Sequence, residues 1–334
     1  MSFSYEELAE IRHYIHQHPE LSGQEYQTTA FLKERLEELG IRILESGLKT
    51  GLIAEIGSGQ PVVALRADID ALPILEQTNL PYKSQHPGVM HACGHDFHQT
   101  SLLGAAALLK EKEDQLEGTI RLIFQPAEEI SEGASDVLAT GLLEDVQGII
   151  GFHNMPQLKA GQLALNAGAM MAGVEKFKVT VTGVSSHAAR PDLGVDTVTA
   201  VTTMVQNVQL LISRTISPFE TAVLSITHLD VGSTWNVLPK SGYFEGTIRS
   251  FNPSVQRELK EHFISIIRHV AASLEVDVAF EWGVTPPVTY NDEELTKVVW
   301  EASQNLAEVI PANPSTAGED FAFYQTTLVN SSSL

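Results

Sequence analysis

The chain has 334 residues, of which 43% are hydrophobic and 19% charged, and its formal net charge is −21. This composition is typical of a globular protein long enough for two domains, and the acidic balance argues against nucleic-acid binding and attachment to anionic membranes. A single cysteine excludes an internal disulfide, the first residues lack the apolar core of a secretion signal, and no apolar run could span a bilayer. We therefore expect a cytoplasmic protein.

The first half of the chain alternates between helices and short apolar strands. Ser4 and Glu7 match a capping box, which predicts a helix that ends near His18 because Pro19 disfavours α geometry before it. A second helix is expected over 28–39. Later elements are predicted as strands at 52–56, 62–66, 120–124 and 148–152, and a Leu- and Ala-rich helix at 100–112.

Three of these strands are followed directly by polar side chains of the types that bind metal ions. In chain order these side chains are Asp68 and Asp70, Glu128 and Glu129, and His153. Sites in open α/β sheets lie outside the carboxyl ends of the strands. The recurrence at three strand ends therefore predicts a metal site at this edge of the sheet.

The segment at 90–98, MHACGHDFH, adds sulfur and nitrogen ligands to these oxygens. Cys93 and His95 offer a thiolate and an imidazole from one short loop, a pair that suits zinc and other borderline first-row metals. Taken alone, the lone cysteine fits a small buried apolar residue equally well. His91 and His98 are further possible ligands, which we interpret as loop and helix-start residues.

These residue types allow hydrolysis with a metal-activated water. If Cys93, His95, Glu129 and His153 hold one or two divalent ions, Glu128 is left free to take a proton from the water and return it to a leaving amine. Neighbouring side chains of a regular strand point in opposite directions. Glu128 and Glu129 can therefore both face the metal only if the chain is irregular after Pro126; otherwise they are exposed loop carboxylates.

Asp68 and Asp70 have several readings that the sequence leaves open. Three roles are open for each: a metal ligand, an acceptor that orients a metal-bound imidazole, or part of a turn before Pro73.

From about residue 175 the pattern changes. Strands at 176–183, 221–229, 242–250 and 276–282 and helices at 195–213 and 254–273 follow the β-α-β-β-α-β order of the ferredoxin-like motif. We therefore predict an inserted domain at 174–284 within an α/β domain made of 1–173 and 285–334, which resumes with a helix around 292–306. His187 follows the first inserted strand and is an ordinary solvated loop histidine unless its domain carries it to a metal centre.

Six motifs resemble, in the same order, one family of metal-dependent hydrolases. The family comprises aminoacylases, hippurate hydrolases, plant auxin-conjugate hydrolases and N-acetyl-diaminopimelate deacetylases. The motifs are RADIDALP (66–73), MHACGHD (90–96), QPAEE (125–129), GFHN (151–154), GVSSHAARPDLGVD (183–196) and GEDFAFY (318–324). The cysteine of MHACGHD is similar to the amidohydrolase branch, because peptidase branches carry an aspartate there.

The resemblance implies a mixed-sheet catalytic domain of the zinc-exopeptidase type, interrupted by a ferredoxin-like lid that also makes a homodimer. It implies two divalent ions, zinc, manganese, nickel or cobalt, held by Cys93, His95, Glu129 and His153. Glu128 matches the general base.

Other matched positions concern the support of the site and the substrate. Asp70 matches the carboxylate that supports the metal site, whereas Asp68 stands where peptidase relatives have a metal-binding histidine. His187 matches a lid histidine that reaches the partner subunit's active site and binds the oxyanion. Asn236 and Arg249 match positions linked to the substrate or its carboxylate.

The expected reaction is hydrolysis of a small N-acyl-L-amino acid to a carboxylate and a free amino acid. N-acetyl-diaminopimelate deacetylase and dipeptidase activities are alternatives. A further alternative is a truncated, non-catalytic dimeric metal-binding protein. Relatives have a metal-binding histidine after the GEDFAFY motif, whereas here the last histidine is His269 and the chain after Tyr324 reads QTTLVNSSSL.

Overall fold

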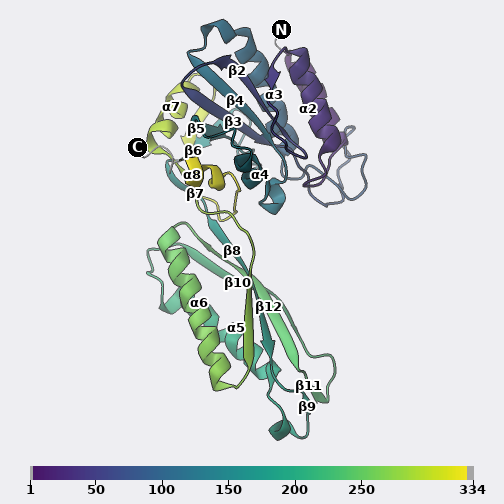
Figure 1. Ribbon diagram of the computed structural model, residues 1–334, viewed down its shortest axis with the longest axis vertical. Helices are drawn as coiled ribbons and strands as arrows, with labels where there is room; N and C mark the ends of the chain where they lie inside the picture. Colours follow the sequence, from purple (N-terminus) through teal and green to yellow (C-terminus); the bar gives the residue numbers. More distant parts are fainter. Residues whose placement is uncertain (1–2, 329–334) are drawn as a thin grey trace. The chain divides into compact units, whose positions relative to one another are not determined.

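The chain forms two units, each with its own sheet (Figure 1). The computed structural model describes residues 3–328. The second unit comprises Ala164–Ala302 and Ile310–Gly318, and the remaining residues form the first. The insertion expected at 174–284 lies inside the second unit. That unit also contains nearly all of the helix predicted around 292–306, which was expected in the catalytic domain. The exact domain boundaries therefore stay a prediction.

The first unit is built on a five-stranded mixed sheet in the order β1-β2-β4-β3-β5. Its strands are β1 (Arg42–Ile43), β2 (Leu52–Ser58), β3 (Val62–Asp68), β4 (Gly118–Gln125) and β5 (Val146–Gly151). β3 pairs in parallel with both β4 and β5, while β2 is antiparallel to β4. The three parallel strands therefore end at one edge, which is the edge that carries the polar residues.

Helices cover both faces of this sheet. They are α1 (Tyr5–Gln17), α2 (Tyr26–Glu38), α3 (His95–Glu111), α4 (Gly133–Ala139) and α8 (Ala322–Leu328), with short 3-10 helices η1 (Glu113–Gln115) and η2 (Glu128–Ile130). Because alternate strand residues point to opposite faces, Ala54 and Leu122 pack with α2 and α3, whereas Ile53 and Ile123 pack with α4 and α8. The predicted α/β class is confirmed.

The helix ends follow local sequence signals in one case and not in another. In α1 the Ser4 side chain accepts from the Glu7 backbone and the Glu7 side chain accepts from the Ser4 backbone, which confirms the capping box. The prediction for α3 was wrong by five residues, because it starts at His95 and not at residue 100. Gly94, at φ 91°, makes the sharp entry, and the first turn is polar because it faces the site, so it carries no apolar periodicity.

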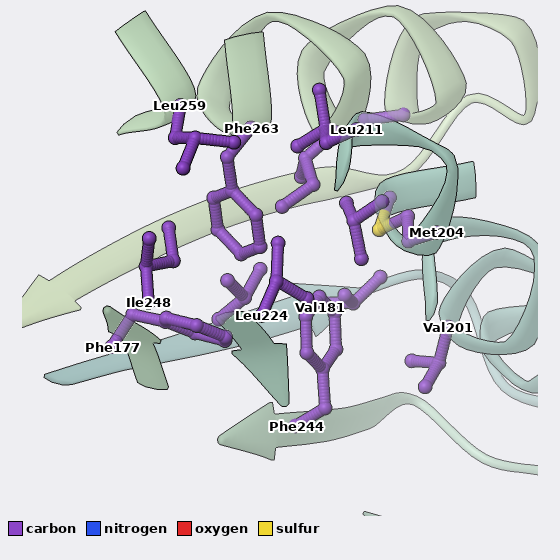
Figure 2. Close-up of a cluster of buried hydrophobic side chains, with 14 of the residues drawn as sticks. Phe177, Val181, Val201, Met204, Leu211, Leu224, Phe244, Ile248, Leu259 and Phe263 are labelled. Atoms are coloured by element: carbon purple, nitrogen blue, oxygen red, sulfur yellow. The ribbon is translucent and has the colours of Figure 1, made fainter. Parts of the chain in front are cut away.

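The second unit has a four-stranded antiparallel sheet in the order β10-β12-β8-β13. Its core elements are β8 (Gly173–Thr182), α5 (Thr197–Arg214), β10 (Ala222–Val231), β12 (Ser241–Ser250), α6 (Pro253–Ser273) and β13 (Asp277–Trp282). Both helices pack on one face, over a core of alternate strand residues such as Phe177 and Phe244 and the helix residue Phe263 (Figure 2). This is the predicted ferredoxin-like fold.

Smaller elements complete the chain, and the sequence pattern predicts only the last of them. They are β6 (Gln162–Leu165), β7 (Gly168–Met171), β9 (Ser186–His187), η3 (Pro191–Leu193), β11 (Val237–Leu238), β14 (Thr289–Asn291), β15 (Glu308–Pro311) and the helix α7 (Glu293–Ser303). Across residues 3–328, every helix is too short or too polar to cross a bilayer.

Candidate metal centre

Four segments meet at the carboxyl ends of β3, β4 and β5. β3 delivers Asp68 and Asp70, the turn into α3 delivers Cys93 and His95, η2 delivers Glu128 and Glu129, and the segment after β5 delivers His153. The donor atoms of Cys93, His95 and His153 all lie within 4.8 Å of one another, and so do those of His95, Glu128 and Glu129. His95 belongs to both groups, so the two groups adjoin.

Cys93 and His153 are in direct contact. The Cys93 Sγ lies 3.3 Å from the His153 Nε2. Burial raises the pKa of the Cys93 thiol, although the charge of the neighbouring His95 opposes that shift. A bound cation would favour the thiolate instead, because a coordinating thiol gives up its proton.

Asp70 orients two of the predicted ligands. Its carboxylate lies 3.1 Å from the His95 Nδ1 and accepts the Glu129 backbone N–H at 3.0 Å and the Ser22 hydroxyl at 2.7 Å. A carboxylate only accepts, so the His95 Nδ1 carries a proton and its Nε2 is the donor atom left for a metal. That nitrogen is 3.8 Å from the Glu129 Oε1.

The buried atoms of this centre match what a divalent ion requires. The His95 Nε2 and the Glu129 Oε1 are both buried and have no hydrogen-bond partner among the described residues. Buried polar atoms are normally paired, and these two face a set of sulfur, nitrogen and oxygen donors. Burial opposes protonation of His95, but Asp68 and Asp70 outweigh it and raise the pKa, so positive charge is favoured at this position. The residues present therefore fit divalent metal ions.

Glu128 lies beside these donors in a strained stretch of backbone. Ala127 has φ 52°, and η2 begins directly after it, so the chain is irregular after Pro126, which is the condition for Glu128 and Glu129 to face one site. Burial, together with the charges of Glu319 and Asp320, raises the pKa of Glu128 to about 11. A cation bound nearby would lower this pKa again, because it favours the carboxylate.

Arg66 pairs with the acidic residues behind the centre, a role that the sequence analysis missed. Its guanidinium lies 2.7 Å from Asp68, 3.0 Å from Glu319 and 2.8 Å from Asp320. It also donates to the Gln125 Oε1 at 2.8 Å. Asp68, whose role was left open, thus accepts from Arg66 and lies 3.7 Å from the His95 Nδ1. The available signal was an arginine inside an otherwise apolar strand.

The other two histidines of the 90–98 segment differ from each other. His98, interpreted as a helix-start residue, is fully buried and lies 2.7 Å from Asp68. His91 is also buried, but neither of its ring nitrogens has a partner among the described residues, and burial lowers its pKa to about 4. His91 belongs to none of the potential metal-binding groups and stays neutral.

The predicted lid residues lie in the second unit at two separate places. His187 in β9 pairs with Val237 in β11, and the Asn236 carbonyl accepts the Ala188 backbone N–H at 3.0 Å. Arg249, near the end of β12, donates to the Thr316 carbonyl at 2.7 Å. The structure thus brings His187 and Asn236 together but places Arg249 apart from them.

The family comparison covers most of the chain. The sequence model of peptidase family M20/M25/M40 matches residues 64–331. An N-acetyl-L-cysteine deacetylase of Bacillus subtilis is 46% identical over 95% of this chain and 77% of its own length. An IAA-amino acid hydrolase, ILR1-like 5 of Arabidopsis thaliana, is 39% identical over 95% of this chain and 75% of its own length.

A solved structure agrees with these matches. The Bacillus subtilis YxeP protein, described as a dinuclear metal-binding peptidase of the M20 family, superposes with a TM-score of 0.86. It is 41% identical to this chain and covers 96% of it and 85% of its own length.

Proposed function

The chain belongs to peptidase family M20/M25/M40, and from this premise we propose that Cys93, His95, Glu129 and His153 hold two divalent metal ions beside Glu128 as general base. The protein is a metal-dependent amidohydrolase that cleaves the amide bond of N-acyl amino acids. One observation carries the site assignment: among residues 3–328, the buried His95 Nε2 and Glu129 Oε1 have no hydrogen-bond partner, and they lie next to a thiol and a second imidazole.

Bound divalent ions supply Lewis-acid polarisation of the substrate carbonyl and make water more acidic near neutral pH. Glu128 carries out the proton transfers. Glu128 takes a proton from the attacking water as the new C–O bond forms. It then gives that proton to the amine nitrogen as the C–N bond breaks, which yields a carboxylate and a free amino acid.

The surroundings of Glu128 suit both halves of this proton transfer. A general base works best when its pKa lies near the working pH. Burial and the neighbouring carboxyls raise this pKa, while cations at the adjacent donors lower it, so the two effects oppose each other. The Asp320 backbone N–H, 3.4 Å from the Glu128 Oε1, helps to keep the carboxylate in place.

The second unit supports a role for a homodimer in this proposal. Ser241 and Arg249 are eight residues apart on β12, and at about 3.3 Å per residue this separates them by roughly 26 Å. At the Ser241 end of β12, the Gly183 N–H donates to the Lys240 carbonyl. The chain segments that carry His187 and Asn236 continue from this point, so both residues lie beyond the Ser241 end. A small N-acyl amino acid cannot contact both ends of one unit.

We therefore propose that a partner subunit supplies His187, for the oxyanion, and Asn236 to a site in which Arg249 binds the substrate carboxylate. β10 is an edge strand of the four-stranded sheet and offers unpaired backbone groups for association. The cytoplasm is the proposed location, and zinc, manganese, nickel or cobalt the proposed metals.

The test is hydrolysis by chelator-treated protein before and after each metal is restored. Release of free amino acid from N-acetyl and N-benzoyl amino acids should require metal and should exceed cleavage of free dipeptides. Equal cleavage of dipeptides would favour the dipeptidase alternative. Metal-independent hydrolysis, or none with any of the four metals, would overturn the assignment.

A further inference from the structure

A row of hydrogen bonds runs from the end of β3 to the proposed ligand His153, and it passes through His98. The His98 Nδ1 lies 2.7 Å from the Asp68 Oδ1, and its Nε2 accepts the backbone N–H of Asn154 at 2.9 Å. The His153 Nδ1 lies 2.8 Å from the carbonyl oxygen of the same Asn154. His98 has no role in the reaction proposed above.

The direction of these bonds is fixed by what each backbone group can do. A backbone N–H only donates, so the His98 Nε2 must hold a lone pair and its proton must sit on Nδ1, directed at the Asp68 carboxylate. The Asn154 Oδ1 lies 2.9 Å from the same Nε2, and turning that amide so that its NH2 faces the ring removes the repulsion between the two lone pairs.

The same reasoning fixes the tautomer of His153. A carbonyl only accepts, so the His153 Nδ1 carries the proton and its Nε2 keeps the lone pair that a metal ion needs. This Nε2 is the atom that lies 3.3 Å from the Cys93 Sγ.

His98 also fixes the position of the segment that carries His153. β5 ends at Gly151, so His153 and Asn154 lie outside the sheet ladder. The His98 ring packs edge-on against the His153 ring, with centroids 4.6 Å apart. Asp68, held by Arg66 at 2.7 Å, anchors the other end of the row.

We propose that His98 is a positioning residue of the metal centre. By accepting the Asn154 N–H, it holds the backbone whose carbonyl sets the orientation and tautomer of His153. This inference rests on the proposed role of His153 as a ligand.

Two substitutions separate the two ends of the row. In His98→Gln the side-chain carbonyl reaches about as far as Nε2 and can still accept the Asn154 N–H. In His98→Asn the shorter amide can donate to Asp68 but does not reach Asn154. Thr100→Val is the matched control, because Thr100 is buried in the same helix and its hydroxyl donates to the Asp96 carbonyl at 2.7 Å, within the helix.

The readout is the dissociation constant for zinc, measured by competition with a chromogenic chelator, beside the melting temperature of the metal-free protein. We expect His98→Asn to weaken zinc binding by about ten- to a hundredfold, the usual effect of losing a group that orients a ligand. His98→Gln should weaken it much less, and Thr100→Val should not change it. A lower melting temperature with unchanged zinc affinity in His98→Asn would overturn the proposal, since it indicates a merely structural role.

His153→Ala distinguishes this inference from the assignment on which it rests. If His153→Ala binds zinc as tightly as the wild type, the ligand assignment itself is wrong. If His153→Ala weakens binding and His98→Asn does not, only the positioning role fails. In the wild type, ¹⁵N shifts of the metal-free protein should show unprotonated Nε2 on both His98 and His153. The opposite tautomer at either ring would overturn the proposal even if His98→Asn fails to fold.

Discussion

The core of the second unit and the polar edge of the first unit's sheet are built from opposite kinds of side chain. The core cluster beneath α5 and α6 is apolar, as with Phe177, Phe244 and Phe263 (Figure 2). At the carboxyl ends of β3 and β4, by contrast, fully or nearly fully buried positions hold charged groups such as Arg66 and Asp320. An apolar core gains stability in proportion to the area it buries, whereas a buried charge is tolerated only when it is paired. The polar edge is therefore arranged for chemistry. Substitutions there should change activity or metal binding, whereas substitutions in the apolar core should change stability alone.

Glu128→Gln is expected to have the largest effect and to separate activity from stability. Loss of the general base should lower kcat/KM for an N-acetyl amino acid by about 10²- to 10⁴-fold. The raised pKa means that folding opposes ionisation of Glu128, and that this cost grows as pH rises from about 4.5 toward 11. The neutral amide removes the cost, so at pH 7 the metal-free variant should be at least as stable as the wild type.

Urea unfolding of the metal-free proteins and steady-state kinetics of the zinc-loaded ones measure the two effects. Glu132→Gln, at an exposed position four residues further along, is the control and should change neither quantity. A Glu128→Gln variant that is both active and destabilised would contradict the proposed role.

Arg66→Met should cost the most stability at the polar edge. The guanidinium contacts Asp68, Glu319 and Asp320, so its loss removes the cation that these buried carboxylates share. Breaking a buried ion pair in this way typically costs about 3–5 kcal/mol. Phe263→Ala in the apolar core should cost a similar amount, about 3–5 kcal/mol, through a cavity.

Zinc affinity distinguishes these two losses. Arg66→Met should also weaken zinc binding, because Asp68 and its neighbours lose their fixed positions, whereas Phe263→Ala should not. Equal zinc affinity in both variants would show that the polar edge serves stability alone.

This contrast also explains how much of the fold was predictable. The alternation of β8 and β12 and the amphipathic helices α5 and α6 predicted the ferredoxin-like unit, because one covered face leaves a clear period of two or 3.6. The three parallel strands of the first unit were predicted from their apolar runs. α4 and α8 were missed, because each has only seven residues and too few turns to show a period.

The site was predictable where the chemistry sits in one short motif and not where it depends on pairing in space. Cys93 and His95 are two residues apart, so sequence alone could place them together. The partners of Arg66 include Asp320, 254 positions away, and no local pattern reveals such a contact. The start of α3 was wrongly predicted for a related reason: the first turn is rich in buried polar residues, and its sequence therefore resembles that of a loop.

The contact between His16 and Asp96 should stabilise the first unit in a pH-dependent way, unlike any apolar contact. Its Nδ1 lies 3.0 Å from the Asp96 Oδ2 and its Nε2 3.4 Å from the Glu76 Oε1. The hydrogen bond to Asp96, together with Glu76, raises the pKa of His16 despite its burial. The stability gained is therefore complete below the unfolded value of about 6.5 and is lost as pH rises through the higher folded value.

At pH 6, His16→Gln should cost about 1.5–3 kcal/mol, the range for hydrogen bonds to charged groups, and the cost should shrink toward pH 9. Urea unfolding of the metal-free proteins at several pH values measures it. His269→Gln, at an exposed position on α6, is the control. A cost that does not vary between pH 6 and 9 would argue against a charged His16.

Tyr324→Phe should have the smallest effect, because it removes one neutral hydrogen bond whose acceptor keeps a second donor. The Tyr324 hydroxyl donates to the Gln125 Oε1 at 2.8 Å, but that oxygen also accepts from the Arg66 Nε at 2.8 Å. No acceptor is left unpaired, so the cost should be about 1 kcal/mol, the usual net value of such a bond. Ile248→Val in the apolar core, expected to cost about 0.5–1.5 kcal/mol, is the matched comparison for urea unfolding. A loss of several kcal/mol in Tyr324→Phe alone would mean that the buried polar groups act as one cooperative network, in which single bonds cannot be removed independently.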